Sequence, residues 1–181
     1  MSGFGALRTV ALAMLAGCSF PDASAQFTES VPDRASFADV AQAMVQKCGT
    51  LDCHGTAYRN LRVYGNTGLR LLPTDQPLSP PCTTTPEVDQ DFDSVVGLEP
   101  EAMSALVAAH GQNPDALTLV RKARGIENHK GGTVMKVGDA LDTCITSWLA
   151  GSAETGACQD AGPPTVPPPA PGQAPRCEPG P

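Results

Sequence analysis

Cys48, Cys53 and His54 lie together in the segment CGTLDCHG, residues 48–55. The thiols of such a pair can add to the two vinyl groups of haem, and the adjacent histidine can then bind the iron from one face. The usual spacing for this attachment is C-x-x-C-H, whereas four residues separate the two cysteines here. We therefore predict covalent attachment of haem c through Cys48 and Cys53, with His54 as an iron ligand, in a longer form of the motif.

Other interpretations of this motif stay open. An exported protein could also join Cys48 and Cys53 in a local disulfide, and His54 would then have no metal to bind. A zinc site needs two further nitrogen or sulfur ligands at short spacing, and no second Cys/His pair follows the motif. A thioredoxin-like redox pair is disfavoured, because its cysteines are separated by two residues and lie near a βαβ pattern.

The first residues have the pattern of an export signal. Arg8 is followed by a short apolar run that ends in Leu15, Ala16, Gly17 and Cys18. The run is too short to span a bilayer permanently. Its last four residues resemble a bacterial lipobox, whose cysteine becomes the lipidated first residue of the mature chain; cleavage near residues 23–25 is the alternative. We predict a signal peptide over residues 1–17 and lipidation at Cys18.

Export places the chain where disulfides form, so the cysteine count is informative. Removing the lipidated Cys18 from the seven cysteines leaves six. If Cys48 and Cys53 carry haem, the other four can form two disulfides in any of three pairings. Without haem, the six could form three disulfides, so the count fits both cases. The four remaining cysteines are Cys82, Cys144, Cys158 and Cys177.

The charge and the motif content exclude several function classes. The formal net charge is -7, and an acidic chain with few aromatic residues is poorly suited to binding nucleic acid. We find no nucleophile elbow, no phosphate-binding glycine loop and no carboxylate pair placed for acid–base chemistry. We therefore expect a protein that is not an enzyme.

Hydrophobic periodicity predicts four short helices. The first begins at the capping pair Ser36 and Asp39 and carries its apolar face to Cys48. The second begins at Pro100 and ends near Gly111, and the third begins at Asn113. The fourth begins at Asp139, and its apolar face consists of Leu141, Cys144, Ile145, Trp148 and Leu149.

The segments between and beyond these helices are predicted to be irregular. Residues 18–35 lack periodicity and are interpreted as a tether, and residues 73–92 contain five prolines, which argue against regular structure. From residue 152 to residue 181 the sequence becomes a Pro-rich tail, predicted to be disordered. Arg59, Arg62 and Arg70 are candidates to bind haem propionates, because arginine binds carboxylates in a fork.

The chain has an amphipathic helix that leads into Cys…Cys-His-Gly, followed by loops, middle helices and a last helix with an inward tryptophan. This order of elements resembles a class I c-type cytochrome domain. The resemblance covers residues 36–151 and is closest to such domains in secreted bacterial lipoproteins. It implies an all-α, cytochrome c-like fold of about four short helices with long loops around a haem. It also implies a second axial ligand to the iron. His129 is the preferred candidate, Met135 is the alternative, and the remaining possibilities are His110 or an iron with no second protein ligand.

Together these features predict a membrane-anchored monohaem c-type cytochrome domain that carries electrons in the bacterial cell envelope. The lipid anchor would attach it to a membrane, with the outer membrane expected, facing the periplasm or the cell surface. Its partner would be another redox protein. The alternative is a haem-free, disulfide-stapled lipoprotein with a structural or binding role.

Overall fold

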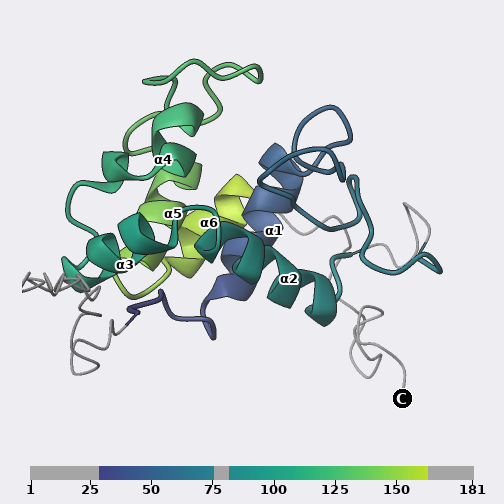
Figure 1. The fold of residues 1–181 in the computed structure, drawn as a ribbon, viewed down its shortest axis with the longest axis horizontal. Coiled ribbons are helices and arrows are strands. Elements are labelled where there is room, and N and C mark those ends of the chain that lie inside the picture. Colours follow the sequence, from purple (N-terminus) through teal and green to yellow (C-terminus); the bar gives the residue numbers. More distant parts are fainter. Residues whose placement is uncertain (1–28, 76–81, 163–181) are drawn as a thin grey trace, which may run out of the picture.

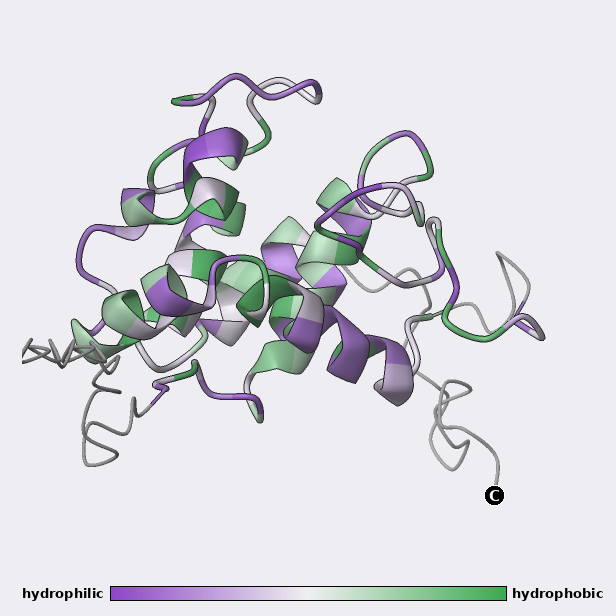
Figure 2. Ribbon diagram, viewed as in Figure 1, coloured by the Kyte–Doolittle hydropathy of each residue, from purple (hydrophilic) through white to green (hydrophobic). Residues whose placement is uncertain are grey.

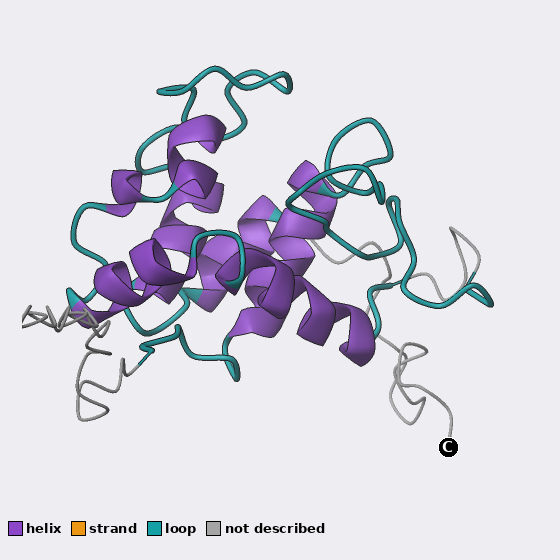
Figure 3. Cartoon of the chain, in the orientation of Figure 1, coloured by secondary structure: helices purple, strands orange, loops and turns teal. Residues whose placement is uncertain are grey.

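The computed structural model describes residues 29–75 and 82–162, and this part of the chain is built from helices and loops (Figure 3). Its only β-type pairing is an isolated bridge between Tyr64 and Leu69. The prediction of an all-α fold is confirmed, although the described residues form six α-helices rather than about four. The helices are α1 (Phe37–Cys48), α2 (Thr85–Val96), α3 (Pro100–Ala108), α4 (Thr118–Ala123), α5 (Ala140–Leu149) and α6 (Thr155–Ala161), with a 3₁₀ turn at Pro114–Ala116 (Figure 1).

Helix α1 has the predicted position and buries the predicted face. The side chains of Phe37, Val40, Ala41, Met44 and Val45 are all buried, and Cys48 is the last residue of the helix. The expected capping pair is not formed, because the Ser36 side chain makes no cap hydrogen bond. Instead the carboxylate of Asp33 accepts hydrogen bonds from the backbone N–H groups of Ala35 and Ser36 just before the helix.

An aromatic cluster joins α1, α2 and α5 at the centre of the core. The ring of Phe37 lies 4.8 Å from Trp148 and 5.3 Å from Phe92, measured between centroids. Trp148 is fully buried, and its indole N–H donates to the carbonyl oxygen of Asp33 at 2.9 Å. This bond matters because a buried indole N–H without a partner would destabilise the fold. In Figure 2 the central helices carry both hydrophobic and hydrophilic residues, and much of α2 is hydrophilic.

Helix α2 overturns the prediction that residues 73–92 lack regular structure. The helix begins within that range, and Thr84 and Glu87 form a capping box at its start. Pro86 lies in the first turn, where the backbone N–H has no helical partner and proline is therefore tolerated. Pro86 thus marks a helix start.

Helix α6 extends the packed region beyond the predicted boundary at residue 151. This short helix packs against α1 and α5, and a disulfide joins Cys144 of α5 to Cys158 of α6. The Pro-rich tail predicted from residue 152 therefore includes a helical segment of the domain. No helix in the described part of the chain is both long and apolar enough to cross a membrane.

The region after α3 also differs from its prediction. His110 does not lie on a buried helical face; it is exposed beyond the end of α3, with a backbone φ of 52°. Asn113 has a left-handed backbone, with φ of 60°, which asparagine tolerates better than most residues. The predicted helix from Asn113 is consequently divided into the 3₁₀ turn and α4. Leu117 and Val120 are buried.

Arg70 lies in a buried ion pair and does not face a ligand cavity. Its Nε donates to Oε1 of Glu87 at 2.7 Å, and the two side chains are only 4% and 0% exposed.

We predict that Arg70→Met lowers the free energy of unfolding by about 3–5 kcal/mol, because Glu87 would keep a buried charge without its cation. Urea denaturation measures this difference. Arg62→Met is the control, since Arg62 is exposed and its loss should change stability by no more than about 0.5 kcal/mol. Equal effects of the two substitutions would contradict the prediction.

Candidate cofactor-binding site

A cavity of about 820 Å³ lies between the loop that follows α1 and the segment formed by α4 and the loop after it. These loops extend from the same side of the helices (Figure 1). The volume is in the range of small-molecule and cofactor sites. The walls include Cys48, Cys53, His54, Arg59 and Leu61 from the first loop and Leu119, Lys122, Ala123, His129 and Val134 from the second region.

The four residues between the cysteines form a tight turn, which brings both thiols to the same cavity. The backbone N–H of His54 donates to the carbonyl of Cys48 at 2.9 Å, which joins the end of the motif to the last residue of α1. The N–H groups of Cys53 and Gly55 both donate to the carbonyl of Thr50, each at 2.9 Å. The longer spacing of the motif therefore does not separate its three functional side chains.

Glycine is required immediately after His54 by close packing of the backbone. A β-carbon at Gly55 or at Gly68 would overlap the carbonyl oxygen of Gly49. The loop containing Gly68 thus packs directly against the turn of the motif. This contact explains why glycine follows His54 in the motif and why residue 68 is also glycine.

Cys48 and Cys53 are free thiols, so the local disulfide considered for this pair is not formed in the structure. Burial, and to a smaller extent the neighbouring Cys53, raises the pKa of the Cys48 thiol to about 12. At neutral pH this sulfur is therefore protonated. The other described cysteines are disulfide-bonded: Cys144 pairs with Cys158, and Cys82 is also in a disulfide.

His54 is held with one ring nitrogen toward the protein. Its Nδ1 lies 3.0 Å from the carbonyl oxygen of Leu61. Because a carbonyl only accepts, Nδ1 carries the proton and Nε2 keeps its lone pair. Burial lowers the pKa of His54, and the charges of His129 and Arg59 lower it further, while the bond to Leu61 opposes them. A neutral imidazole with its second nitrogen bonded to a backbone carbonyl is the usual form of a metal-binding histidine.

His129 has the same arrangement on the other side of the cavity. Its Nδ1 lies 3.0 Å from the carbonyl oxygen of Gly132, so the neutral tautomer that donates this bond has its lone pair on Nε2. The rings of His54 and His129 are 5.9 Å apart between centroids and inclined by 18°. Two imidazoles that bind one metal ion from opposite sides, with each nitrogen about 2 Å from it, have centroids roughly 6 Å apart. The two rings are nearly parallel and stacked, and their centroid distance is compatible with two imidazoles that would hold one iron ion between them.

The other two candidates for the second axial ligand lie elsewhere. Met135 is in the hydrophobic core, only 1% exposed, and does not line the cavity. Its backbone N–H donates to the carbonyl of Ala123, which fixes the chain so that the side chain points into the core. His110 is also absent from the cavity walls. Of the three, only His129 faces His54.

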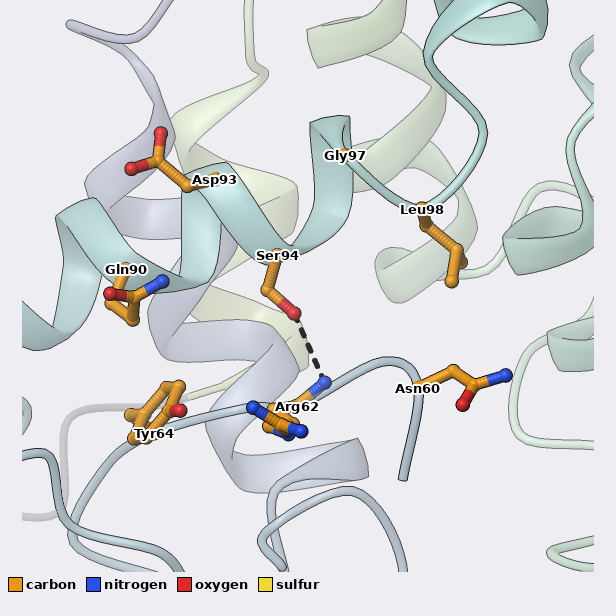
Figure 4. Close-up of a pocket in the computed structure, with 8 residues that line it drawn as sticks. All are labelled: Asn60, Arg62, Tyr64, Gln90, Asp93, Ser94, Gly97 and Leu98. Atoms are coloured by element: carbon orange, nitrogen blue, oxygen red, sulfur yellow. Dashed lines mark hydrogen bonds between the residues drawn. The ribbon is translucent and has the colours of Figure 1, made fainter. Parts of the chain in front are cut away.

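The three candidate arginines have three different positions. Arg59 lines the cavity, and its Nε donates to the carbonyl of Cys53 at 3.2 Å. Arg62 lines a second, polar hollow of about 540 Å³ beside α2, where its backbone N–H donates to Oγ of Ser94 (Figure 4). Arg70 is in the buried ion pair with Glu87.

Sequence reasoning missed two cations at the cavity, Lys122 and Lys130. Both lie near His129 in the sequence. Lys122 is paired with Glu127, whose Oε1 lies 2.8 Å from its Nζ. Arg59 and Lys130 still outnumber Asp52, the one acidic residue on the cavity walls, although the whole chain is acidic. The site therefore has a local positive charge suited to an anionic group.

Comparison with protein-family models, with curated proteins and with solved structures gave no match to this chain. No family is assigned from these comparisons. Within the described ranges, no group of three or more His, Cys, Asp or Glu side chains is placed to hold a metal ion. A haem iron needs only two protein ligands, because the porphyrin supplies four nitrogens. Cys18, the predicted lipidation site, and Cys177 lie outside the described residues.

We predict that, among the cysteines that the structure describes, Cys48 and Cys53 can be alkylated without reduction when protein prepared without haem is denatured. In the folded protein at about pH 8, Cys48 should react more slowly than in the unfolded chain by roughly tenfold or more, because its thiolate is scarce. Iodoacetamide labelling followed by peptide mass spectrometry measures both the extent of labelling in the denatured protein and the labelling rate of Cys48 in the folded protein. Absence of any labelling at these two positions before reduction would contradict the prediction and indicate a disulfide between them.

Proposed function

We propose that this protein is a membrane-anchored, monohaem c-type cytochrome domain that carries electrons in the bacterial cell envelope. The observation that carries the proposal is the His54–His129 pair, with ring centroids 5.9 Å apart, beside two free thiols on the wall of one cavity. Cys48 and Cys53 would hold haem c through thioether bonds, and His54 and His129 would bind its iron. When bound, the haem iron accepts one electron and passes it on.

The walls of the cavity suit both parts of a haem group. Leu61, Leu119, Ala123 and Val134 provide apolar surface for the porphyrin ring. Arg59 and Lys130 would provide positive charge for the propionates, and the arginine can bind a carboxylate through two donors.

The cytochrome c-like arrangement of the helices is part of the proposal. Helix α1 ends at the first cysteine of the motif, and it packs against α5 through Phe37 and Trp148. The loops between these helices form the cavity. These features support the resemblance noted in the sequence.

Two histidines on opposite sides of the site favour electron transfer over ligand binding. An iron with both axial positions filled has no open position for a small molecule, and the protein then only needs to exchange electrons with a redox partner protein. The pair of histidines also predicts a lower reduction potential than a His–Met pair would give, since methionine ligation raises it.

The test is an absorption spectrum of the protein exported by cells that can mature c-type cytochromes. We expect a Soret band that stays with the polypeptide after acid–acetone extraction and an α band that sharpens on reduction. A colourless protein from these cells, with Cys48 and Cys53 bridged in peptide maps, would overturn the proposal. That result would favour the haem-free, disulfide-stapled lipoprotein.

The membrane anchor has its own test. We predict that Cys18→Ser releases the protein from the membrane fraction, because the substituted residue cannot be lipidated. Fractionation with immunoblotting measures the distribution, and amino-terminal sequencing establishes that the signal has been removed. A cleaved Cys18→Ser protein that stays in the membrane fraction would contradict the lipid anchor.

A further inference from the structure

The segment Leu61–Tyr64 connects His54 to helix α2. On one side, the carbonyl of Leu61 accepts from Nδ1 of His54 at 3.0 Å, and the backbone N–H of Val63 donates to the carbonyl of His54 at 2.9 Å. Both the ring and the backbone of His54 are therefore held by this segment. Leu61 and Val63 are buried, so the segment is fixed in the core.

Two side chains of α2 hold the other side of the same segment. The N–H of Arg62 donates to Oγ of Ser94 at 3.0 Å (Figure 4), and the N–H of Tyr64 donates to Oδ1 of Asp91 at 2.7 Å. Asp91 and Ser94 are three residues apart and so project from the same face of the helix. The N–H groups of the segment thus alternate between α2 and His54.

Asp91 is an unusual residue to hold a backbone segment in place. Its side chain is fully buried, and its Oδ2 has no hydrogen-bond partner among the described residues. The pKa of this carboxyl is raised to about 8, mainly by burial. The hydrogen bond from Tyr64 acts to lower the pKa, and the negative charge of Glu87 acts to raise it. Glu87 lies one helical turn earlier and is paired with Arg70. Asp91 can therefore gain or lose a proton near neutral pH.

We propose that Asp91 is a positioning residue through which α2 fixes His54, and that its proton is exchanged in step with the charge in the cavity. The second part rests on the proposed function, because the charge is that of the electron carried there. When an electron arrives from a donor protein, the cavity becomes more negative and Asp91 takes up a proton from water. When the electron passes to the next protein, Asp91 returns the proton to water.

The positioning role is tested on protein without haem. In carboxyl ¹³C NMR spectra we expect one carboxyl to titrate near pH 8 and to be missing from Asp91→Asn, with ring resonances of His54 shifting over the same pH range. Asn is nearly isosteric with the protonated acid and can still accept from Tyr64. Asp93→Asn is the matched control, because Asp93 is an exposed carboxylate on the same helix and should leave both titrations unchanged. If the ring resonances of His54 do not shift over the pH range in which Asp91 titrates, the positioning role is overturned.

The link to electron transfer is tested on protein that carries haem. The reduction potential should fall as the pH rises through about 8, because ionised Asp91 favours the more positive, oxidised site. Asp91→Asn should remove this step, whereas Ser94→Ala, which removes only the non-titrating bond to the segment, should keep it. Identical pH profiles for the wild type and Asp91→Asn would overturn the link. Failure of haem attachment would instead count against the proposed function and leave the NMR test decisive for positioning.

Discussion

Replacing both Cys48 and Cys53 with serine is expected to abolish covalent haem attachment. Both thiols are free and both line the cavity that His54 and His129 also line, and in the proposed arrangement each would bond to one vinyl group of the same porphyrin. Serine keeps the size of the side chain but cannot form the thioether bond. Cys53→Ser alone should abolish attachment or reduce it by about half. The pyridine haemochrome yield per polypeptide after acid–acetone extraction measures the loss.

Leu51→Ala is a suitable control for this experiment. Leu51 lies in the same turn of the motif, and its side chain is 66% exposed, so its removal should leave attachment unchanged. A double serine variant that retains covalent haem would show that other residues form the thioether bonds. The assignment of the motif would then be wrong.

Replacing His129 with alanine is expected to open one axial position of the bound iron. The covalent bonds should persist, but the absorption spectrum should change from the low-spin to the high-spin form. The reduced variant should bind carbon monoxide readily, whereas the wild type, with both positions filled, should not. Spectrophotometric titration of the dithionite-reduced proteins with carbon monoxide measures this difference. His54→Ala should have a similar effect on ligation and a larger one on haem retention, since His54 belongs to the attachment motif.

Two variants distinguish His129 from the other candidates. Met135→Leu nearly preserves side-chain volume, and because Met135 lies in the core it should retain the low-spin spectrum. His110→Ala removes an exposed ring and should also have no effect. A high-spin spectrum in Met135→Leu together with a low-spin spectrum in His129→Ala would reverse the assignment.

The helices that hold the site were predictable where an apolar face repeats at helical spacing. Helices α1 and α5 follow that pattern, and the inward direction of Trp148 was part of it. Helix α2 was missed because five prolines precede or enter it, although Thr84 and Glu87 have the spacing of a capping box. Helix α6 was missed because its residues are small and polar, and its position depends on packing against α1 and on the disulfide to Cys144.

The site itself was predictable only in its local part. Cys48, Cys53 and His54 are neighbours in the chain, so their spacing alone indicated a common role. The position of His129 followed only from a family resemblance, because 74 residues separate it from His54 and no local pattern joins them. The same holds for the bond between Tyr64 and Asp91 and for the ion pair between Arg70 and Glu87. Such contacts arise from the tertiary fold.

The central claim is that His54 and His129 bind one haem iron from opposite sides. The near-infrared magnetic circular dichroism spectrum of the oxidised protein tests it most directly, because His–His, His–Met and thiolate ligation give charge-transfer bands at different wavelengths. We predict the His–His band in the wild type and its loss in His129→Ala. A His–Met band, a high-spin spectrum, or the His–His band persisting in His129→Ala would contradict the assignment.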